Sequence, residues 1–400
     1  MTSLFDKFLP LEETRAELVA VSGVDPFHVV VEKVVSATEA MINGRKVIMA
    51  GTNNYLGLTF DPECIAAACT ALREEGTGTT GSRMANGSYA AHVALENELA
   101  AFFNCAAAIV FSTGYIANLA ILSTLTGPED VILLDTDCHA SIYDGTRLGS
   151  AQVIRFLHNN PADLEKRLQR LGDRAGNTLV VVEGIYSMLG DRAPLREIVA
   201  VKNRFGASLL VDEAHSLGVL GEHGRGLAEA LDVEAEVDFI TGTFSKSLGS
   251  IGGFCASRMP ELEYVRYAMR PYIFTASSSP SLIASTRKAL EILCRGSALR
   301  KKLWDNATQL YRGLAAMGFE LGPEVSPVIA VRLPASVGET TALWNELLSQ
   351  GIYVNLVLPP ATPGGKPLLR CSLSAAHSPV QIKAILDAFA LIREKLQPHT

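Results

Sequence analysis

Charged residues are scarce in this sequence, and basic residues do not cluster. Charged residues make up 19% of the 400 residues, and the formal net charge at pH 7 is -7. A chain of this kind offers no basic surface for nucleic acid. Hydrophobic residues reach 48%, which argues against an intrinsically disordered protein. We therefore expect a compact α/β enzyme with more than one domain.

Several features of exported, membrane and metal-binding proteins are missing. The seven cysteines are scattered and form no C-x-x-C pair, which predicts reduced thiols rather than disulfides or a zinc site. The first residues lack a basic segment followed by an apolar run, and no stretch of about 18 apolar residues occurs. No P-loop sequence is present. We expect a cytoplasmic protein without a metal ion, and any membrane contact would be peripheral.

Between residues 60 and 260, short apolar runs alternate with stretches of helical periodicity. The runs are almost continuously apolar, which is typical of strands that are buried on both faces. Their alternation with helices predicts an α/β fold with a mostly parallel sheet covered on both sides. The seven predicted strands are Ala107–Phe111, Val131–Leu134, Val153–Phe156, Leu179–Glu183, Ser208–Val211, Phe239–Thr241 and Gly253–Ala256.

The N-terminal region has a different pattern. Residues 3–21 place four apolar residues at helical spacing, namely Leu4, Phe8, Leu11 and Leu18. This pattern indicates an amphipathic arm that packs on its own subunit or on a dimer partner, in preference to a membrane. Short strands are expected at 29–35 and 46–49.

A smaller α+β region is expected after residue 290. Its predicted helices are 281–293, 298–317, 339–350 and 378–396, and its predicted strands are 328–332, 353–357 and 368–372. The sequence therefore predicts three parts: an N-terminal segment at 1–55, a large domain at 56–290 and a small C-terminal domain at 291–400.

One loop, Thr241–Gly249, concentrates reactive groups directly after a predicted strand. Its Lys246 stands among small hydroxyl residues and glycines. A lysine amine that is shielded from water becomes nucleophilic at neutral pH and can form a Schiff base. The hydroxyls of Thr243 and Ser245 can hold a phosphate beside it. The alternative is an exposed lysine in an ordinary polar turn.

Further polar groups follow other predicted strands. Ser112–Tyr115 precede a helical stretch, and the amides at a helix start bind phosphate, although an ordinary N-cap explains this pattern as well. His139 follows the second predicted strand, and Asp212 and His215 follow the fifth. Parallel sheets bind ligands at the carboxyl ends of their strands, so these groups are expected in one cleft.

Together these groups match the requirements of pyridoxal 5'-phosphate. Lys246 would form a Schiff base with the cofactor, and the Asp212 carboxylate would keep the pyridine nitrogen protonated, which makes the ring an electron sink. The His139 ring would stack on the cofactor, and His215 would donate to its 3'-oxygen. Two alternatives stay open. Either histidine could be structural, and Asp212 with Glu213 could bind a metal, although no further ligands stand at a useful spacing.

Several segments of the sequence resemble the α-oxoamine synthases. These segments are Gly78–Gly87, Phe111–Asn118, His139–Gly145, Tyr186–Asp191, Val211–Gly218, Thr243–Gly249 and Tyr272–Ala276. The resemblance runs from about residue 25 to the end of the chain. Members of this family are fold-type I pyridoxal-phosphate enzymes that join an amino acid to an acyl-CoA with loss of CO2. The resemblance implies a fold like that of aspartate aminotransferase, with a seven-stranded large domain and a smaller α+β C-terminal domain.

The resemblance also implies how the cofactor is held. Lys246 would carry it and move protons, while the amides of Gly114 and Tyr115 would bind its phosphate together with the hydroxyls of Thr243 and Ser245. The roles of Asp212, His215 and His139 would be those given above.

Other implied roles concern the substrate and a second subunit. Thr275 would reach the phosphate of the neighbouring subunit, so the active unit would be a homodimer. Arg370 would bind the substrate carboxylate, which its guanidinium fork matches. Asn54 and Tyr55 would come from the partner chain near the substrate.

Within this family, the loop Pro359–Pro363 and the segment Leu368–Ser372 are most similar to members that condense L-serine with palmitoyl-CoA. That reaction gives 3-ketodihydrosphingosine, CoA and CO2. Leu358 departs from some of these members, which carry arginine there. The alternatives are a sister synthase that uses alanine with pimeloyl-CoA or glycine with a short acyl-CoA, a non-catalytic regulatory subunit, and an aminotransferase of the same fold.

Overall fold

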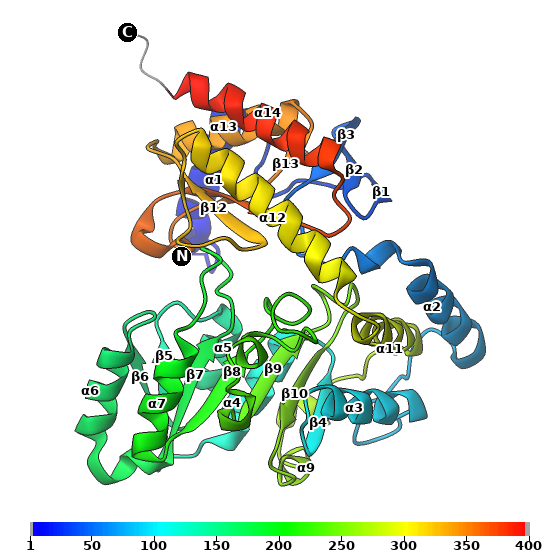
Figure 1. Ribbon diagram of the computed structural model, residues 1–400, viewed down its shortest axis with the longest axis vertical. Coiled ribbons are helices and arrows are strands. Elements are labelled where there is room, and N and C mark those ends of the chain that lie inside the picture. The colour runs from blue at the N-terminus through cyan, green and yellow to red at the C-terminus, as the bar shows by residue number, and fades with distance from the viewer. Residues whose placement is uncertain (1–2, 397–400) are drawn as a thin grey trace. The chain divides into compact units, whose positions relative to one another are not determined.

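The computed structural model describes residues 3–396 and contains two compact units (Figure 1). The larger unit contains Asn54–Ser187 and Asp191–Lys301, and the smaller unit contains the described residues of Met1–Asn53, Met188–Gly190 and Lys302–Thr400. The predicted N-terminal segment thus belongs to the same unit as most of the predicted small domain. Among residues 3–396, no helix is both long and apolar enough to span a membrane.

The larger unit is built on a seven-stranded sheet (Figure 1). Its strand order is β4-β10-β9-β8-β7-β5-β6. The strands are β4 (Ala107–Phe111), β5 (Val131–Asp135), β6 (Gln152–Phe156), β7 (Thr178–Glu183), β8 (Ser208–Asp212), β9 (Phe239–Thr243) and β10 (Gly253–Ser257). Only β10 runs antiparallel to its neighbours. The structure therefore confirms the mostly parallel sheet that the apolar runs predict.

Burial follows the position of each strand in the sheet. Every residue of β4, β5, β7, β9 and β10 is buried. The edge strand β6 instead exposes three of its five residues. The apolar residues of β6 therefore do not indicate burial on both faces, because this strand lies at the edge of the sheet.

The strands β9 and β10 form a hairpin that carries the lysine loop. Thr243 pairs with Gly253 at the last rung of the hairpin, and the amide of Phe244 donates to the carbonyl of Gly252. Residues 244–252 are thus closed at both ends by the same pair of strands. Lys246 lies in this closed loop rather than in a strand-to-helix connection.

Helices surround the sheet of the larger unit. They are α2 (Pro62–Glu75), α3 (Ala90–Phe102), α4 (Gly114–Leu125), α5 (Ala140–Leu148), α6 (Pro161–Leu171), α7 (Leu195–Phe205), α8 (Leu227–Ala230), α9 (Leu262–Val265), α10 (Arg270–Ile273) and α11 (Pro280–Cys294). The helices α4 and α5 pack against each other, as do α2 and α11. Gly145 permits the first contact, because a Cβ at this position would lie 2.8 Å from the carbonyl oxygen of Asn118.

The smaller unit contains two four-stranded sheets. One has the order β1-β2-β3-β13 and contains Lys33–Ser36, Glu39–Ile42, Arg45–Met49 and Ile352–Tyr353. The other has the order β11-β12-β15-β14 and contains Glu320–Leu321, Val328–Arg332, Leu368–Ser372 and Asn355–Val357. The helices are α1 (Leu9–Ser22), α12 (Ala298–Ala316), α13 (Val337–Ser349) and α14 (Pro379–Lys395), and α12 begins in the larger unit.

Three expectations for the smaller unit need correction. The strand predicted at 29–35 begins only at Lys33, and β2 was missed. The strand predicted at 353–357 is two strands in different sheets, because Tyr353 pairs with β3 and Asn355 with β15. The N-terminal helix packs on α13 through buried Leu18, but Leu4, Phe8 and Leu11 are exposed.

Candidate functional site

A cavity of about 260 Å³ opens at the carboxyl ends of the parallel strands in the larger unit. It is lined from five directions: by the start of α4, the start of α5, and the residues that end or follow β7, β8 and β9. The residues that the sequence predicts for cofactor binding and that line this cavity are Gly114, Tyr115, His139, Asp212, His215, Thr243, Ser245 and Lys246. The sheet topology therefore brings together residues that are more than 130 positions apart in the chain, such as Gly114 and Lys246.

Two glycines, Gly249 and Gly114, allow neighbouring segments to approach the lysine loop closely. Gly249 ends the lysine loop with a φ of +61°, and a Cβ there would lie 2.8 Å from the amide nitrogen of Thr59. Gly114 begins α4, and a Cβ there would lie 2.7 Å from the Cβ of Thr243. Each position therefore needs glycine, since a side chain would push the start of α4 away from Thr243 or the end of the lysine loop away from Thr59.

An anion-binding corner lies where α4 meets the lysine loop. Thr113 caps α4 by accepting a hydrogen bond from the amide of Ile116 at 3.0 Å. The amides of Gly114 and Tyr115 belong to the first turn, where helix amides have no partner within the helix. The hydroxyls of Thr243 and Ser245 lie 2.9 Å apart on the facing loop. Amides at a helix start beside hydroxyl groups suit a phosphate.

Asp212 is a buried carboxylate that faces the cavity. Its Oδ2 accepts a hydrogen bond from Asn118 at 2.8 Å, and its Oδ1 accepts one from the amide of Ala214 at 2.9 Å. Burial raises the pKa of neighbouring Glu183 well above its ordinary value, and the Asp212 charge adds to this effect. The buried Asp212 carboxylate is suited to pair with a buried cation such as a protonated ring nitrogen.

The two histidines of the cavity are both held through Nδ1. Nδ1 of His139 lies 2.8 Å from the hydroxyl of Ser141, and Nδ1 of His215 lies 2.7 Å from the hydroxyl of Tyr55. Desolvation lowers the pKa of His139, the Asp212 charge acts in the opposite direction, and the charge of Lys246 adds to the lowering. The imidazole of His139 is thus favoured in its neutral form, which can stack on an aromatic ring.

Asn54 and Tyr55, which are expected to act in a partner's site, are both buried in the larger unit. The side chain of Tyr55 is fully buried and contacts His215 of its own chain. Asn54 is also buried and donates to the hydroxyl of Thr59 at 2.7 Å. Tyr55 therefore supports His215 of its own chain, and the role of Asn54 and Tyr55 near the substrate of a partner chain stays a prediction.

Three other residues of interest lie outside this cavity. Thr275 lines a separate small cavity of the larger unit, next to Tyr272. Arg370 lies on β15 in the smaller unit, where it is buried and donates to Oδ1 of Asn53 at 3.0 Å. Leu358 is buried in the same unit. The roles of Thr275 and Arg370 remain predictions.

Three polar residues support the site although they were not among the predicted site residues. Glu183 accepts a hydrogen bond from the backbone amide of His139, Asn118 bonds to Asp212, and Ser141 bonds to His139. All three lie in or directly beside segments that stood out in the sequence, but Glu183 and Asn118 bond to partners 44 and 94 positions away. Only the strand register shows Glu183 beside Asp212.

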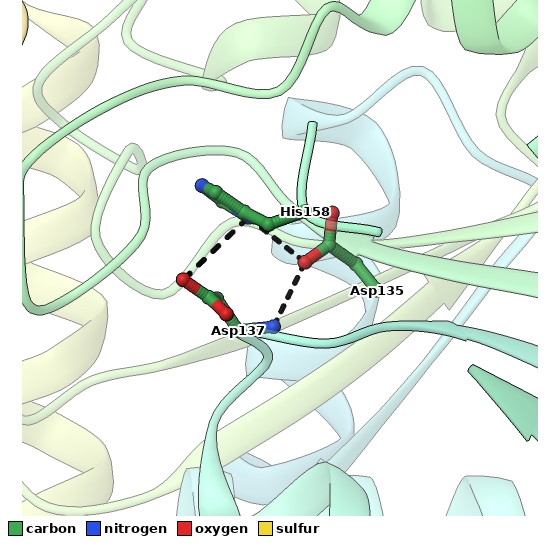
Figure 2. Close-up of side chains that lie close together, drawn as sticks. All are labelled: Asp135, Asp137 and His158. Carbon is green, nitrogen blue, oxygen red and sulfur yellow. Dashed lines mark hydrogen bonds and ion pairs between the residues drawn. The ribbon is translucent and has the colours of Figure 1, made fainter. Parts of the chain in front are cut away.

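A second polar cluster lies next to the site and includes Asp135, Asp137 and His158 (Figure 2). One ligand atom of each residue lies within 4.8 Å of the others, as in a metal site. However, Nδ1 of His158 lies 2.9 Å from Asp135, and Nε2 lies 2.7 Å from Asp191. Burial alone would lower the pKa of His158, but these two carboxylates raise it to about 10. The cluster is thus an imidazolium held between buried carboxylates.

The cavity fits one cofactor, pyridoxal phosphate. It offers a lysine amine, a buried carboxylate for a ring nitrogen, a neutral imidazole for a ring face and an anion-binding corner for a phosphate. This donor set defines a pyridoxal-phosphate-dependent enzyme. The family model for class I and II aminotransferases matches residues 45–389. The chain belongs to that family and, within it, to the α-oxoamine synthases.

The similar proteins carry a more specific name. The serine palmitoyltransferase of Caulobacter vibrioides is 57% identical over 97% of this chain and 96% of its own. The structure of the Sphingomonas wittichii serine palmitoyltransferase has a TM-score of 0.96 at 52% identity and covers 99% of both chains. A variant of the S. paucimobilis enzyme with a bound PLP–myriocin aldimine gives a TM-score of 0.96 at 49% identity, with 99% of both chains covered. 8-Amino-7-oxononanoate synthases also match, at lower identity.

Proposed function

We propose that this protein is a serine palmitoyltransferase, which condenses L-serine with palmitoyl-CoA to give 3-ketodihydrosphingosine, CoA and CO2. The proposal is carried by one observation: 57% identity to an enzyme of that name over nearly the full length of both chains. The cavity around Lys246 supports it, because its donor set fits the cofactor that this chemistry needs.

Each residue of the cavity has its own role in the proposed reaction. Pyridoxal phosphate, when bound, supplies a ring that withdraws electrons from the Cα of the amino acid. Lys246 holds the cofactor, then removes the proton from Cα and returns one at the end. Asp212 keeps the ring nitrogen protonated, and His215 donates to the 3'-oxygen. His139 stacks on the ring face, while Thr243, Ser245 and the start of α4 hold the phosphate.

Substrate recognition is assigned to Arg370 and His139. A guanidinium binds a carboxylate through two parallel hydrogen bonds, so Arg370 is suited to the carboxylate of L-serine. Together the two side chains would orient this carboxylate so that its bond to Cα can break.

The proposal includes a homodimer with shared active sites, in which Thr275 binds the phosphate held by the neighbouring subunit. It also includes a cytoplasmic location. The seven cysteines are all free thiols, which is usual in a reducing compartment. Sedimentation of the purified protein tests the dimer, and fractionation of cells tests the location.

The test of the activity is an absorbance titration of the pyridoxal-phosphate-loaded protein with L-serine, L-alanine and glycine, followed by acyl-CoA of several lengths. We expect a saturable spectral change with L-serine and release of CoA from palmitoyl-CoA. Lys246→Ala should abolish CoA release, whereas Lys166→Ala, which removes an exposed lysine of α6, should not. A response to alanine with pimeloyl-CoA alone would instead assign the protein to the sister synthases.

A further inference from the structure

A chain of hydrogen bonds connects Asp212 to His139 beneath the floor of the cavity. Nδ2 of Asn118 lies 2.8 Å from Oδ2 of Asp212 and 3.0 Å from the hydroxyl of Ser141. This hydroxyl lies 2.8 Å from Nδ1 of His139. Asn118 lies on α4 and Ser141 on α5, and both side chains are buried. Two neighbouring helices thus connect the two groups expected to contact the cofactor ring.

The direction of these bonds follows from the chemistry of the donors and acceptors. An ionised carboxylate can only accept, so Asn118 must turn its NH2 group, and not its carbonyl oxygen, toward Asp212. The second hydrogen of this NH2 group goes to the oxygen of Ser141. The hydroxyl hydrogen of Ser141 is then available to donate to Nδ1 of His139, if this nitrogen carries a lone pair.

A second observation on the same ring places this lone pair on Nδ1. His139 is the N-cap of α5, and its Nδ1 accepts the backbone amide of Ser141 at 3.2 Å. A protonated Nδ1 could not accept this bond, and a positive charge is unfavourable at a helix N-terminus. The neutral ring therefore carries its only proton on Nε2.

We propose that Asn118 and Ser141 are positioning residues that keep His139 neutral with its ring proton on Nε2, so that the ring offers a hydrogen-bond donor to the carboxylate of the bound amino acid. The last step of this inference rests on the proposed function, but the tautomer does not. The charged or titratable groups around the ring are Asp212, Lys246, Glu183 and Tyr115. Of these groups, only Asp212 is joined to the ring through the Asn118–Ser141 chain.

The tautomer is tested by nitrogen NMR of the full-length protein with ¹⁵N-labelled histidine, both without cofactor and loaded with pyridoxal phosphate. His139→Gln identifies the signals of this ring among the eight histidines. We expect a lone-pair nitrogen at Nδ1 and a protonated nitrogen at Nε2 at neutral pH. A proton on Nδ1, or a doubly protonated ring, would overturn the proposal whatever the enzyme catalyses.

The positioning role is tested with Ser141→Ala. Loss of the hydroxyl leaves only the longer backbone-amide bond to Nδ1, so it should increase the share of the other tautomer and weaken L-serine binding by about three- to tenfold, the value of one hydrogen bond. Ser141→Thr keeps a hydroxyl and should restore the wild-type tautomer. Ser123→Ala is the matched control, because its hydroxyl on α4 bonds only to carbonyls of its own helix.

Unchanged nitrogen signals and serine affinity in Ser141→Ala would refute the positioning role. Asn118→Leu provides a second route to the same question: it removes the link to Asp212 while it leaves the hydroxyl of Ser141 in place. We expect it to shift the tautomer in the same direction as Ser141→Ala. Failure of the wild-type protein to bind any amino acid, with the expected tautomer in place, would refute the proposed function and leave the tautomer standing.

Discussion

Arg370 is a buried guanidinium on a central strand of its sheet, and its side chain donates to an amide oxygen. We predict that Arg370→Ala weakens L-serine binding by about 1.5–3 kcal/mol, the cost of one hydrogen bond to a charged group. This corresponds to roughly a 10- to 150-fold higher dissociation constant, which the absorbance titration measures. Arg332→Ala on the adjacent strand is the control, because Arg332 forms a partly exposed ion pair with Glu320. Equal serine affinities in both variants would remove Arg370 from the site.

Single residues also show how far sequence reasoning reaches. Lys246, Asp212 and His139 could be predicted, because each reactive side chain directly follows a strand whose end lies at the ligand-binding edge. The burial of Tyr55 could not be predicted, since a motif does not reveal whether a side chain packs in its own chain or in a partner. Asn118 and Ser141 carry ordinary polar groups, and only their partners give them a role.

Gly114 brings the first turn of α4 against the lysine loop, so it tests the phosphate site at the scale of an element. In Gly114→Ala the new Cβ would lie 2.7 Å from Thr243. We predict that the start of the helix is displaced and that pyridoxal phosphate binds about tenfold more weakly or worse. The measurement is an absorbance titration of cofactor into the protein without cofactor. Gly127→Ala is the control, since its Cβ would meet only the Asp130 carboxylate at 3.7 Å.

The ion pairs of His158 join the end of β5, where Asp135 lies (Figure 2), and the loop after β6 to Asp191. The pKa of His158 is raised to about 10 in the folded chain, above the ordinary histidine value of about 6.5. The contribution of the charged His158 ring to the stability of the fold is therefore complete below about pH 6.5 and is lost as the pH rises toward 10. We predict that His158→Gln lowers the free energy of unfolding by up to about 5 kcal/mol at pH 6 and by much less at pH 10.

Urea unfolding of wild type and variant at both pH values measures this difference. His28→Gln, which removes an exposed histidine, should have little effect at either pH. A His158→Gln effect that is the same at both pH values would show that the ring stabilises the chain by packing alone, with no contribution from its charge.

The elements differ in how well their sequences predict them. Strands of the seven-stranded sheet were predicted to within two residues at each end, because burial on both faces leaves a continuous apolar signal. The hairpin of β1 and β2 was not, since both strands have only four residues and β1 has no buried residue, which leaves little signal. The split between β13 and β14 depends on which sheet each residue joins, which no local pattern encodes.

At the scale of the whole molecule, the proposed shared site makes a prediction about mixed dimers. Lys246→Ala removes the amine from one subunit, and Thr275→Val removes the proposed phosphate contact that serves its neighbour. A mixed dimer would keep one intact site, which combines Lys246 of the second variant with Thr275 of the first. We expect activity at limiting pyridoxal phosphate to appear when the two variants are unfolded and refolded together, but not when they are refolded separately. Absence of this recovery in a proven mixed dimer would place Thr275 outside the neighbouring site.

The hairpin of β9 and β10 has a practical consequence for anyone who wishes to alter this pocket. Because Thr243 and Gly253 pair on the last rung, the loop that carries Lys246 begins and ends on the same rigid support. The position of the amine therefore depends on this one hairpin. Redesign for other amino acids or acyl donors should therefore leave this hairpin unchanged. The strand-to-helix loops are better positions for variation, because their two ends belong to different elements.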